Sequence, residues 1–210
     1  MGKFTGDAGV TGVVGTVVIS SWKGIKYMKA RGHVSKKPPT EMQLQQQAKI
    51  SLVSKFVYSM KALLEKSFIG YAVKKTGTNA AFSYNFKNCI AGAYPALLID
   101  YSLALVSRGD LPNATDVVAT AGAGGQVQFT WTDNTGTGQA KGSDKCIGVI
   151  HCAALNITMY SNGDETRQAG SLLLDAHQLT GKTIETWLVI IASNGADAAN
   201  SVYTGQLVVG

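Results

Sequence analysis

The sequence predicts an α+β protein, in which an N-terminal β-hairpin and a long amphipathic helix precede an immunoglobulin/fibronectin-like antiparallel β-sandwich. Three observations predict this class. Apolar residues recur at helical spacing over residues 38–68, the spacing changes to every second residue after position 97, and 24 glycines against 4 prolines indicate a turn-rich β protein. We place the domain boundary between an N-terminal region, residues 1–96, and a sandwich, residues 97–210.

The first segment is rich in glycine, which occurs at every third position: Gly6, Gly9, Gly12 and Gly15. Without proline these triplets do not predict a collagen helix, so we expect a flexible arm that packs closely on a neighbouring backbone. Residues 16–19 and 25–28 then alternate as two short strands, with a turn between them. The pattern predicts a hairpin.

The longest periodic segment covers residues 38–68. Pro38 and Pro39 end any extended stretch, and Thr40 with Gln43 has the spacing of a capping box. An apolar stripe follows at Leu44, Ala48, Leu52, Phe56, Met60 and Leu64, and Val53, Val57 and Leu63 widen it at steps of three and four. We expect one helix of roughly 40 Å, at about 1.5 Å per residue, that ties two β regions together. Residues 79–90 predict a shorter helix, closed by Gly92 and Pro95.

Alternating apolar residues predict about seven strands in the C-terminal region. They fall in these segments: 97–105, 127–131, 145–153, 156–160, 171–174, 183–192 and 201–209. Turn signals lie between them at Asp133–Gly136, Asn162-Gly163 and Asn194-Gly195, and we expect the two Asn-Gly pairs to form hairpin turns. The alternation also places Trp131 and Trp187 toward the core.

Charge is scarce and unevenly placed. Charged residues make up 15% of the chain, which is low for a free monomer and favours self-association. The net charge is +10 through Lys75 and −4 from Thr76 onward, which together give the +6 of the whole chain. A basic front could bind nucleic acid or another polyanion, could contact the acidic back of a neighbouring copy, or could be a solvated surface without a partner.

The basic hairpin and its exit form the one candidate site. Cationic and aromatic residues alternate there: Trp22, Lys23, Lys26, Tyr27, Lys29, Arg31, Lys36 and Lys37. Such a surface can neutralise phosphates and stack bases. It can equally form a contact between subunits, with Trp22 and Tyr27 buried and the lysines facing an acidic sandwich. We favour the contact between subunits, because the acidic partner is present in the same chain.

Nothing in the sequence predicts an enzyme or a cofactor. Cys89, Cys146 and Cys152 form no CxxC motif, and His33, His151 and His177 have no ligand spacing, so no metal site is expected. We expect buried, reduced thiols in a reducing compartment and structural histidines. Nucleophile elbows, phosphate-binding loops and paired carboxylates are absent from the sequence.

Short matches to other motifs carry little weight. Arg108-Gly109-Asp110 matches an adhesion tripeptide but is better interpreted as a turn. Asn113-Ala114-Thr115 and Asn156-Ile157-Thr158 match the glycosylation sequon, which means little without a secretory signal. The apolar residues 10–19 are interrupted by Gly12 and Gly15, so we expect no signal peptide, no membrane span and synthesis in the cytoplasm. Incorporation into a virion or another assembled particle is the expected destination.

A set of short motifs resembles a known family. They are Trp22-Lys23-Gly24-Ile25, Lys37-Pro38-Pro39-Thr40 with Gln43, Tyr84-Asn85, Lys87-Asn88, Ala91-Gly92, Tyr94-Pro95, Ile99-Asp100-Tyr101-Ser102, Ser107-Arg108-Gly109-Asp110-Leu111, Phe129-Thr130-Trp131, Asp144-Lys145 and Ser201-Val202-Tyr203. Together they resemble an uncharacterised family of Bacteroidota proteins of about 210 residues, a domain of unknown function. The resemblance runs nearly end to end and implies no activity, cofactor or catalytic residue.

The sequence therefore favours a structural subunit that assembles with copies of itself into a particle, tube or filament, in a setting such as a phage-derived assembly. The basic N-terminal arm would dock on neighbouring copies. Two alternatives remain open: a module that binds nucleic acid or another polyanion through its basic half, and a sandwich that binds carbohydrate on a platform of Trp131 and Trp187.

Overall fold

The computed structural model describes residues 2–3, 11–22, 24–32 and 37–210. The chain divides into two units, Met1–Thr40 and Glu41–Gly210. This division differs from the predicted boundary between residues 96 and 97, because residues 53–106 share one hydrophobic core with the sandwich. The helices are thus part of the body, which we use below as the name for unit Glu41–Gly210.

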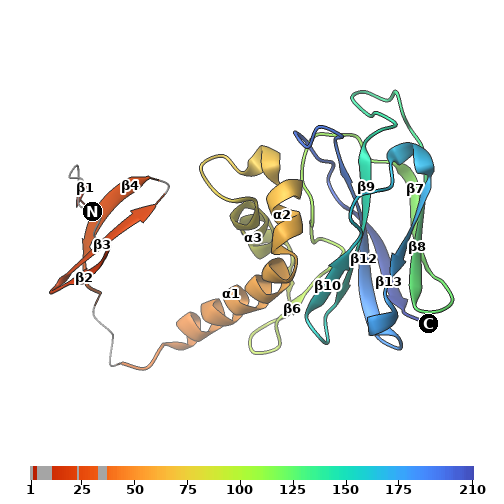
Figure 1. The fold of residues 1–210 in the computed structure, drawn as a ribbon. Coiled ribbons are helices and arrows are strands. Elements are labelled where there is room, and N and C mark those ends of the chain that lie inside the picture. The colour runs from red at the N-terminus through yellow and green to blue at the C-terminus, as the bar shows by residue number, and fades with distance from the viewer. Residues whose placement is uncertain (1, 4–10, 23, 33–36) are drawn as a thin grey trace. The chain divides into compact units, whose positions relative to one another are not determined.

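The N-terminal unit is a small antiparallel sheet (Figure 1). Its strands are β1 (Gly2–Lys3), β2 (Gly12–Val14), β3 (Val17–Trp22) and β4 (Ile25–Ala30), in the order β1-β4-β3-β2. The predicted hairpin is confirmed as β3 and β4, which pair from Val17↔Ala30 to Trp22↔Ile25. Gly15 has a φ of 59° in the turn before β3, a conformation that favours glycine. Gly6 and Gly9 lie outside the described residues.

The predicted single helix is two helices, α1 (Glu41–Ser59) and α2 (Lys61–Ser67), followed by the 3-10 turn η1 (Ile69–Tyr71). The prediction of one continuous helix is wrong at Met60, which leaves helical geometry with φ −126° and ψ 27°. Each four-residue step moves an apolar stripe about 40° around a 3.6-residue helix, so a straight helix would carry the stripe off the core. The break at Met60 keeps Met60, Leu63 and Leu64 buried.

The second predicted helix is confirmed as α3 (Gly77–Asn88). Thr76 caps its N-terminus by accepting a hydrogen bond from the backbone N–H of Asn79 at 3.1 Å. The Glu65 carboxylate accepts bonds from the Thr78 hydroxyl at 2.6 Å and from the Gly77 N–H at 3.0 Å. These bonds join α2 to α3. They also lower the pKa of Glu65, and the bond from the Thr78 hydroxyl makes the largest contribution.

The sandwich is confirmed. One sheet has the order β10-β9-β12-β13, from β9 (Lys145–Cys152), β10 (Ile157–Tyr160), β12 (Thr183–Ile191) and β13 (Val202–Val208). The other has the order β11-β8-β7, from β7 (Thr115–Ala121), β8 (Gln126–Thr132) and β11 (Ser171–Asp175). Two 3-10 turns, η2 (Arg167–Ala169) and η3 (His177–Leu179), precede and follow β11. Three strands facing four is the fibronectin-like arrangement.

Two strand predictions fail. Residues 97–105 form only the short strand β6 (Leu98–Ile99), which pairs with β5 (Ile90–Ala91), because the Asp100 carboxylate accepts the Ser102 N–H at 3.0 Å and turns the chain. The first sandwich strand, β7, is absent from the prediction. Asn194-Gly195 joins the paired strands β12 and β13 as predicted, whereas Asn162-Gly163 connects β10 to β11 in the other sheet.

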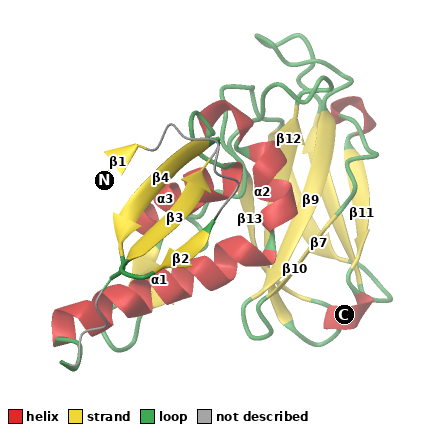
Figure 2. Cartoon of the chain, turned by 60° about the vertical axis from the view of Figure 1, so that its left-hand side comes forward, coloured by secondary structure: helices red, strands yellow, loops and turns green. Residues whose placement is uncertain are grey.

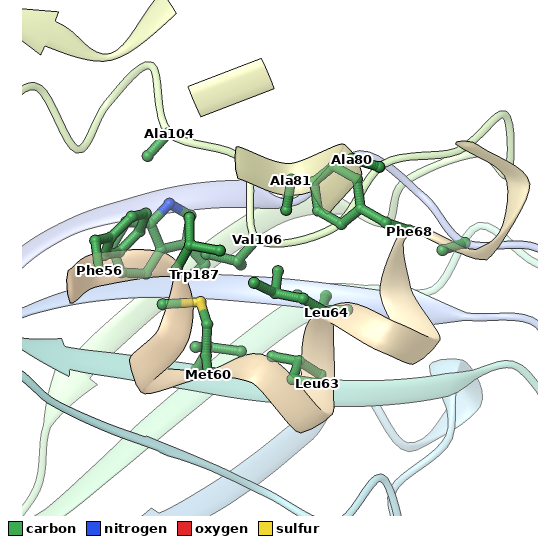
Figure 3. Close-up of a cluster of buried hydrophobic side chains, with 14 of the residues drawn as sticks. Phe56, Met60, Leu63, Leu64, Phe68, Ala80, Ala81, Ala104, Val106 and Trp187 are labelled. Carbon is green, nitrogen blue, oxygen red and sulfur yellow. The ribbon is translucent and has the colours of Figure 1, made fainter. Parts of the chain in front are cut away.

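The sheet that holds β9 and β12 separates two cores. Figure 2 shows the helices on one side of it and β7 and β11 on the other. Along β9, Ile147 and Val149 face the helices, while Cys146 and Ile150 face the second sheet. Figure 3 shows Phe56, Met60 and Leu64 gathered around Trp187 on the helical side. The body is thus three layers: helices, sheet and sheet.

In the described part of the chain, no helix is long and apolar enough to cross a membrane.

Candidate interaction surface

The N-terminal sheet carries apolar side chains on both faces. Because cross-strand partners share a face, the pairs Trp22↔Ile25, Ser20↔Tyr27 and Val18↔Lys29 lie together, with Val13 opposite Val18. We call this the tryptophan face. The other face carries Val14, Val17, Ile19 and Met28. A sheet that is apolar on both faces needs a cover on each.

The described residues of the N-terminal unit supply neither cover. Val13, Val14, Trp22 and Ile25 are 55–58% exposed. Among the residues whose burial is described, none before Val53 is buried. A small sheet without a buried face is only marginally stable in water, so this sheet gains stability when a surface covers it.

The predicted site residues divide between the faces of the sheet and its exit. Trp22, Tyr27 and Lys29 share the tryptophan face, whereas Lys26 lies on the opposite face, paired with Ser21. Arg31 and Lys37 follow β4 and are exposed, and the Arg31 N–H donates to the Thr16 carbonyl at 2.7 Å. Lys23 and Lys36 lie outside the described residues. The structure therefore brings three of the eight residues together on one face.

The two units divide the net charge differently from the division of the sequence at Lys75. Residues 1–40 contain seven Lys and Arg and one Asp, so they hold the whole net charge of +6. The body contains twelve of each sign. Within it, residues 41–96 carry +5 and residues 97–210 carry −5. The sandwich exposes most of its carboxylates: Asp110, Asp116, Asp133, Asp164, Glu165 and Asp175.

The buried polar groups of the body are structural. His151 is buried beneath α1, with its ring edge-on to Phe56 at 5.1 Å and Nδ1 at 2.8 Å from the Thr158 hydroxyl, which lies 2.6 Å from the Ser59 hydroxyl. Burial lowers the pKa of His151 to about 4, so the ring is neutral near pH 7. It joins β9, β10 and α1 instead of serving as a base open to substrate.

A buried ion pair connects the loops at one end of the sandwich. The fully buried Arg167 approaches Asp144 at 3.2 Å and donates to the Asn134 side chain at 2.7 Å and the Pro112 carbonyl at 2.8 Å. Trp131 Nε1 donates to the Arg167 carbonyl at 2.7 Å. This network holds together the loops that contain Pro112, Asn134 and Asp144.

The remaining predictions about chemistry concern the cysteines, the other two histidines and metal ligands. All three cysteines are free and buried, and burial raises the pKa of Cys89 and Cys146 to about 12. His177 is exposed and lies 2.8 Å from Asp175. His33 lies outside the described residues. No cluster of metal-ligating side chains occurs in the part of the chain that was described.

The carbohydrate platform is contradicted. Trp131 is 6% exposed and Trp187 is 0% exposed, and both belong to the hydrophobic cores, as their alternation predicts. The Arg-Gly-Asp segment is equally unsuited to adhesion, because Gly109 is buried and a Cβ there would overlap the Ala198 carbonyl. The segment lies against residues 197–200, which precede β13.

Sequence reasoning missed a basic cleft on the body. Its lining includes Tyr71, Lys75, Ser83, Tyr84, Lys87 and Arg108. The Arg108 guanidinium carbon lies 4.1 Å from the Tyr71 ring centre and 5.1 Å from that of Tyr84. Lys75 lies between η1 and α3, Lys87 lies in α3, and Arg108 lies in the loop before β7. No regular sequence spacing therefore links the three charges.

The sequence matches a family of unknown function, DUF6266, across residues 9–205. The chain belongs to DUF6266. The motifs that resemble a family of unknown function supply buried polar residues in this member: Asn85, Ser107, Asp144 and Ser201. All four hydrogen-bond to loops or to neighbouring elements of the body.

Among solved structures, this DUF6266 chain is similar to the FN1–FN3 domains of chicken CNTN1, with 12% identity and a TM-score of 0.36. The match covers 48% of this chain and 33% of the chicken chain, so it spans about a third of that solved chain. A search of curated proteins finds no match.

Proposed function

We propose that this DUF6266 protein is a structural subunit that assembles with copies of itself into a particle, tube or filament. In this proposal the three-layer body is the rigid unit, and the N-terminal sheet docks on the body of a neighbouring copy. One observation carries it: the N-terminal sheet has two apolar faces and no buried residue among its described positions.

The apolar residues define what the docking contact must bury. Trp22 and Ile25 pair directly at the end of the hairpin, and Val13 continues the same face through Val18. Full burial of an aliphatic side chain contributes about 1.5–3 kcal/mol, and Trp side chains are enriched among residues that dominate interfaces. A few such residues can therefore supply much of the free energy of a contact between subunits.

Charge supports another copy as the partner. The N-terminal unit has a net charge of +6, and the sandwich residues 97–210 have a net charge of −5. Complementary potentials orient an encounter and suppress contact between like surfaces. Identical copies that meet front to back generate rings or open filaments, which agrees with a building block.

Strand addition to the N-terminal sheet is one form that the proposed contact could take. β2 pairs only with residues 17–19 of the longer β3. Among the described residues, 20–22 have no partner strand on that edge. An exposed sheet edge can accept a strand from another chain.

The test is the molar mass of the purified chain in solution. Light scattering after size exclusion at neutral pH should give a mass well above the 22.1 kDa monomer, and electron micrographs should show regular particles or filaments. The mass should fall with rising salt, because screening weakens contacts between charged surfaces. A 22.1 kDa monomer at all concentrations would contradict the proposal.

A double variant locates the contact. Trp22→Gln with Ile25→Gln removes two exposed apolar side chains from the tryptophan face and should return the protein to a monomer. Leu155→Gln with Ile157→Gln is the matched control, because these residues are 48% and 44% exposed on the body. Assembly that survives the first variant, or is lost only in the second, would place the contact elsewhere.

The concentration of the whole net charge in residues 1–40 supports a second candidate, a module that binds nucleic acid or another polyanion. This candidate predicts retention on a polyanion column with a steep dependence on salt. Replacing Lys26, Lys29 and Lys37 together by Glu should abolish retention. Unchanged retention in that triple variant would exclude the N-terminal sheet as a polyanion site.

A further inference from the structure

We propose that the basic cleft around Arg108 binds a small organic oxyanion, an organic molecule that carries a phosphate ester or carboxylate group. The cleft lies on the body, between η1, α3 and the loop that precedes β7, and has a volume of about 380 Å³. This inference is independent of the self-assembly proposed above.

Arg108 is held ready for a ligand. Its guanidinium group packs over the Tyr71 ring at 4.1 Å and the Tyr84 ring at 5.1 Å. Stacking on aromatic faces fixes the plane of a guanidinium and leaves the N–H groups at its edge, where they match the two oxygens of a carboxylate or phosphate. The orientation of the guanidinium group is therefore already restricted before a ligand binds.

The backbone on both sides of Arg108 is also fixed. The Arg108 N–H donates to the Ser67 carbonyl at 3.0 Å, and the Ser107 hydroxyl donates to the Ala199 carbonyl at 2.7 Å. Gly109 packs so closely on Ala198 that a Cβ has no room. Arg108 thus extends from a segment clamped between α2 and the sandwich, which lowers the ordering cost of binding.

The charges of the cleft leave room for an anion. Lys75 and Lys87 line it together with Arg108, and its lining contains no Asp or Glu. Within the described residues, no carboxylate pairs with Arg108 and no protein acceptor receives a bond from its guanidinium, whereas the buried Arg167 has Asp144 at 3.2 Å. Arg167 is satisfied by the protein, and Arg108 is available to a ligand.

The size and the other lining residues indicate an organic ligand. A volume of about 380 Å³ exceeds what a single inorganic anion fills and is at the small end of ligand sites, roughly 300–1,000 Å³. Ala80 and the tyrosine rings offer apolar contact, and Ser83 and Asn88 offer polar contact. Phenyl phosphate and benzoate are suitable probes of the phosphate and carboxylate forms.

The experiment is calorimetric titration of the full chain with phenyl phosphate, benzoate, inorganic phosphate and the neutral benzyl alcohol. We expect one of the two organic anions to bind more tightly than inorganic phosphate, and benzyl alcohol not to bind. The tighter of the two identifies the acid group. Inorganic phosphate that binds as well as both, benzyl alcohol that binds equally, or no binding by either organic anion would overturn the proposal.

Three variants test the residues. Arg108→Gln should weaken binding of the better probe at least about tenfold, and Arg108→Lys should recover only part of the loss, because a lysine lacks the planar fork. The exposed pair Lys75→Gln with Lys87→Gln should weaken binding about tenfold without disturbing the fold, since each exposed charge contributes modestly. Unchanged affinity in Arg108→Gln, or in that pair, would overturn the assignment.

Two controls separate this cleft from the N-terminal sheet. Lys182→Gln removes an exposed charge elsewhere on the body and should leave affinity unchanged. Lys26→Gln, Lys29→Gln and Lys37→Gln together should also leave it unchanged, although they test the N-terminal surface. Loss of binding in that triple variant would assign the anion to the N-terminal unit and overturn the cleft.

Discussion

Both units contain strands with apolar residues on both faces, with opposite results for burial. In β12 of the body, every residue from Ile184 to Ile191 is buried, because helices cover one face of the sheet and a second sheet covers the other. In β3 and β4 of the N-terminal sheet, no described residue is buried. Periodicity therefore identifies a strand, and the covering layers decide whether that strand belongs to a core.

Two tryptophans show the difference within one residue type. Trp187 is completely buried, and its ring centre lies 5.5–6.1 Å from those of Phe56, Tyr101 and Tyr203. Trp22 is 55% exposed at the end of the hairpin. The body is thus stabilised internally, and we propose that the N-terminal sheet uses the same chemistry to contact another copy.

The largest expected effect is on the body. Trp187→Ala should lower the free energy of unfolding by about 3–5 kcal/mol, the range for large-to-small changes of a buried aromatic residue. In the described structure Trp187 Nε1 has no hydrogen-bond partner, so the loss comes from packing. Urea denaturation followed by circular dichroism measures it, with Trp22→Ala as the matched control, expected below about 0.5 kcal/mol. Equal losses in both would remove the contrast between the units.

Acid should destabilise the body next most strongly. Burial lowers the pKa of His151 from 6.5 to about 4. Between these values the unfolded chain binds the proton and the folded protein does not, so stability decreases as pH falls from about 6.5 to about 4, by up to about 3 kcal/mol.

The measurement is the free energy of unfolding at several pH values between 4 and 7, for the wild type and for His151→Gln. The variant should be less stable at pH 7 but should lose less stability on acidification. An identical slope in the two proteins would contradict the assignment of this pH dependence to His151.

A smaller effect is expected at the junction of helix and sandwich. Asn85 Nδ2 donates to the Leu105 carbonyl at 3.0 Å, and Oδ1 accepts the Leu105 N–H at 3.0 Å. Asn85→Ala leaves both backbone groups without these partners and should cost about 2 kcal/mol. Asn88→Ala, on the same helix but exposed, is the control and should cost under about 0.5 kcal/mol. Thermal unfolding that gives the same loss in both would contradict the role of Asn85.

Deletion of the N-terminal unit should have the smallest effect on the stability of the body. Removing residues 1–40 should alter the free energy of unfolding of the body by less than about 0.5 kcal/mol at low protein concentration, because both hydrophobic cores lie within residues 53–209. Denaturant titration of the shortened chain checks this. A loss of several kcal/mol would mean that the N-terminal sheet packs on its own body.

Much of the fold follows from local patterns. The hairpin, α3 and most sandwich strands were predictable because their residues alternate or repeat without interruption. The break at Met60 was not, since it depends on the sheet that the helix crosses. β7 was missed because Ala119 is its sole buried residue and Asp116 adopts a positive φ of 52°, so no alternation is visible.

The candidate sites were likewise predictable only where their residues are adjacent in sequence. The basic hairpin was predictable because its charges are adjacent in sequence. The opposite faces of Lys26 and Lys29 required the strand register. The cleft around Arg108 unites residues 71–88 with residue 108, and only the packing of the loop before β7 on α2 and α3 places them together.

The buried thiols have a practical consequence. Cys89 and Cys146 hold their protons to a pKa of about 12, and Cys152 is as inaccessible as they are. A maleimide should therefore not react with the folded native chain, since the thiolate is the reactive form. A cysteine introduced at position 22 would be the one thiol accessible to alkylation. Its protection from alkylation would show directly whether neighbouring copies cover that position.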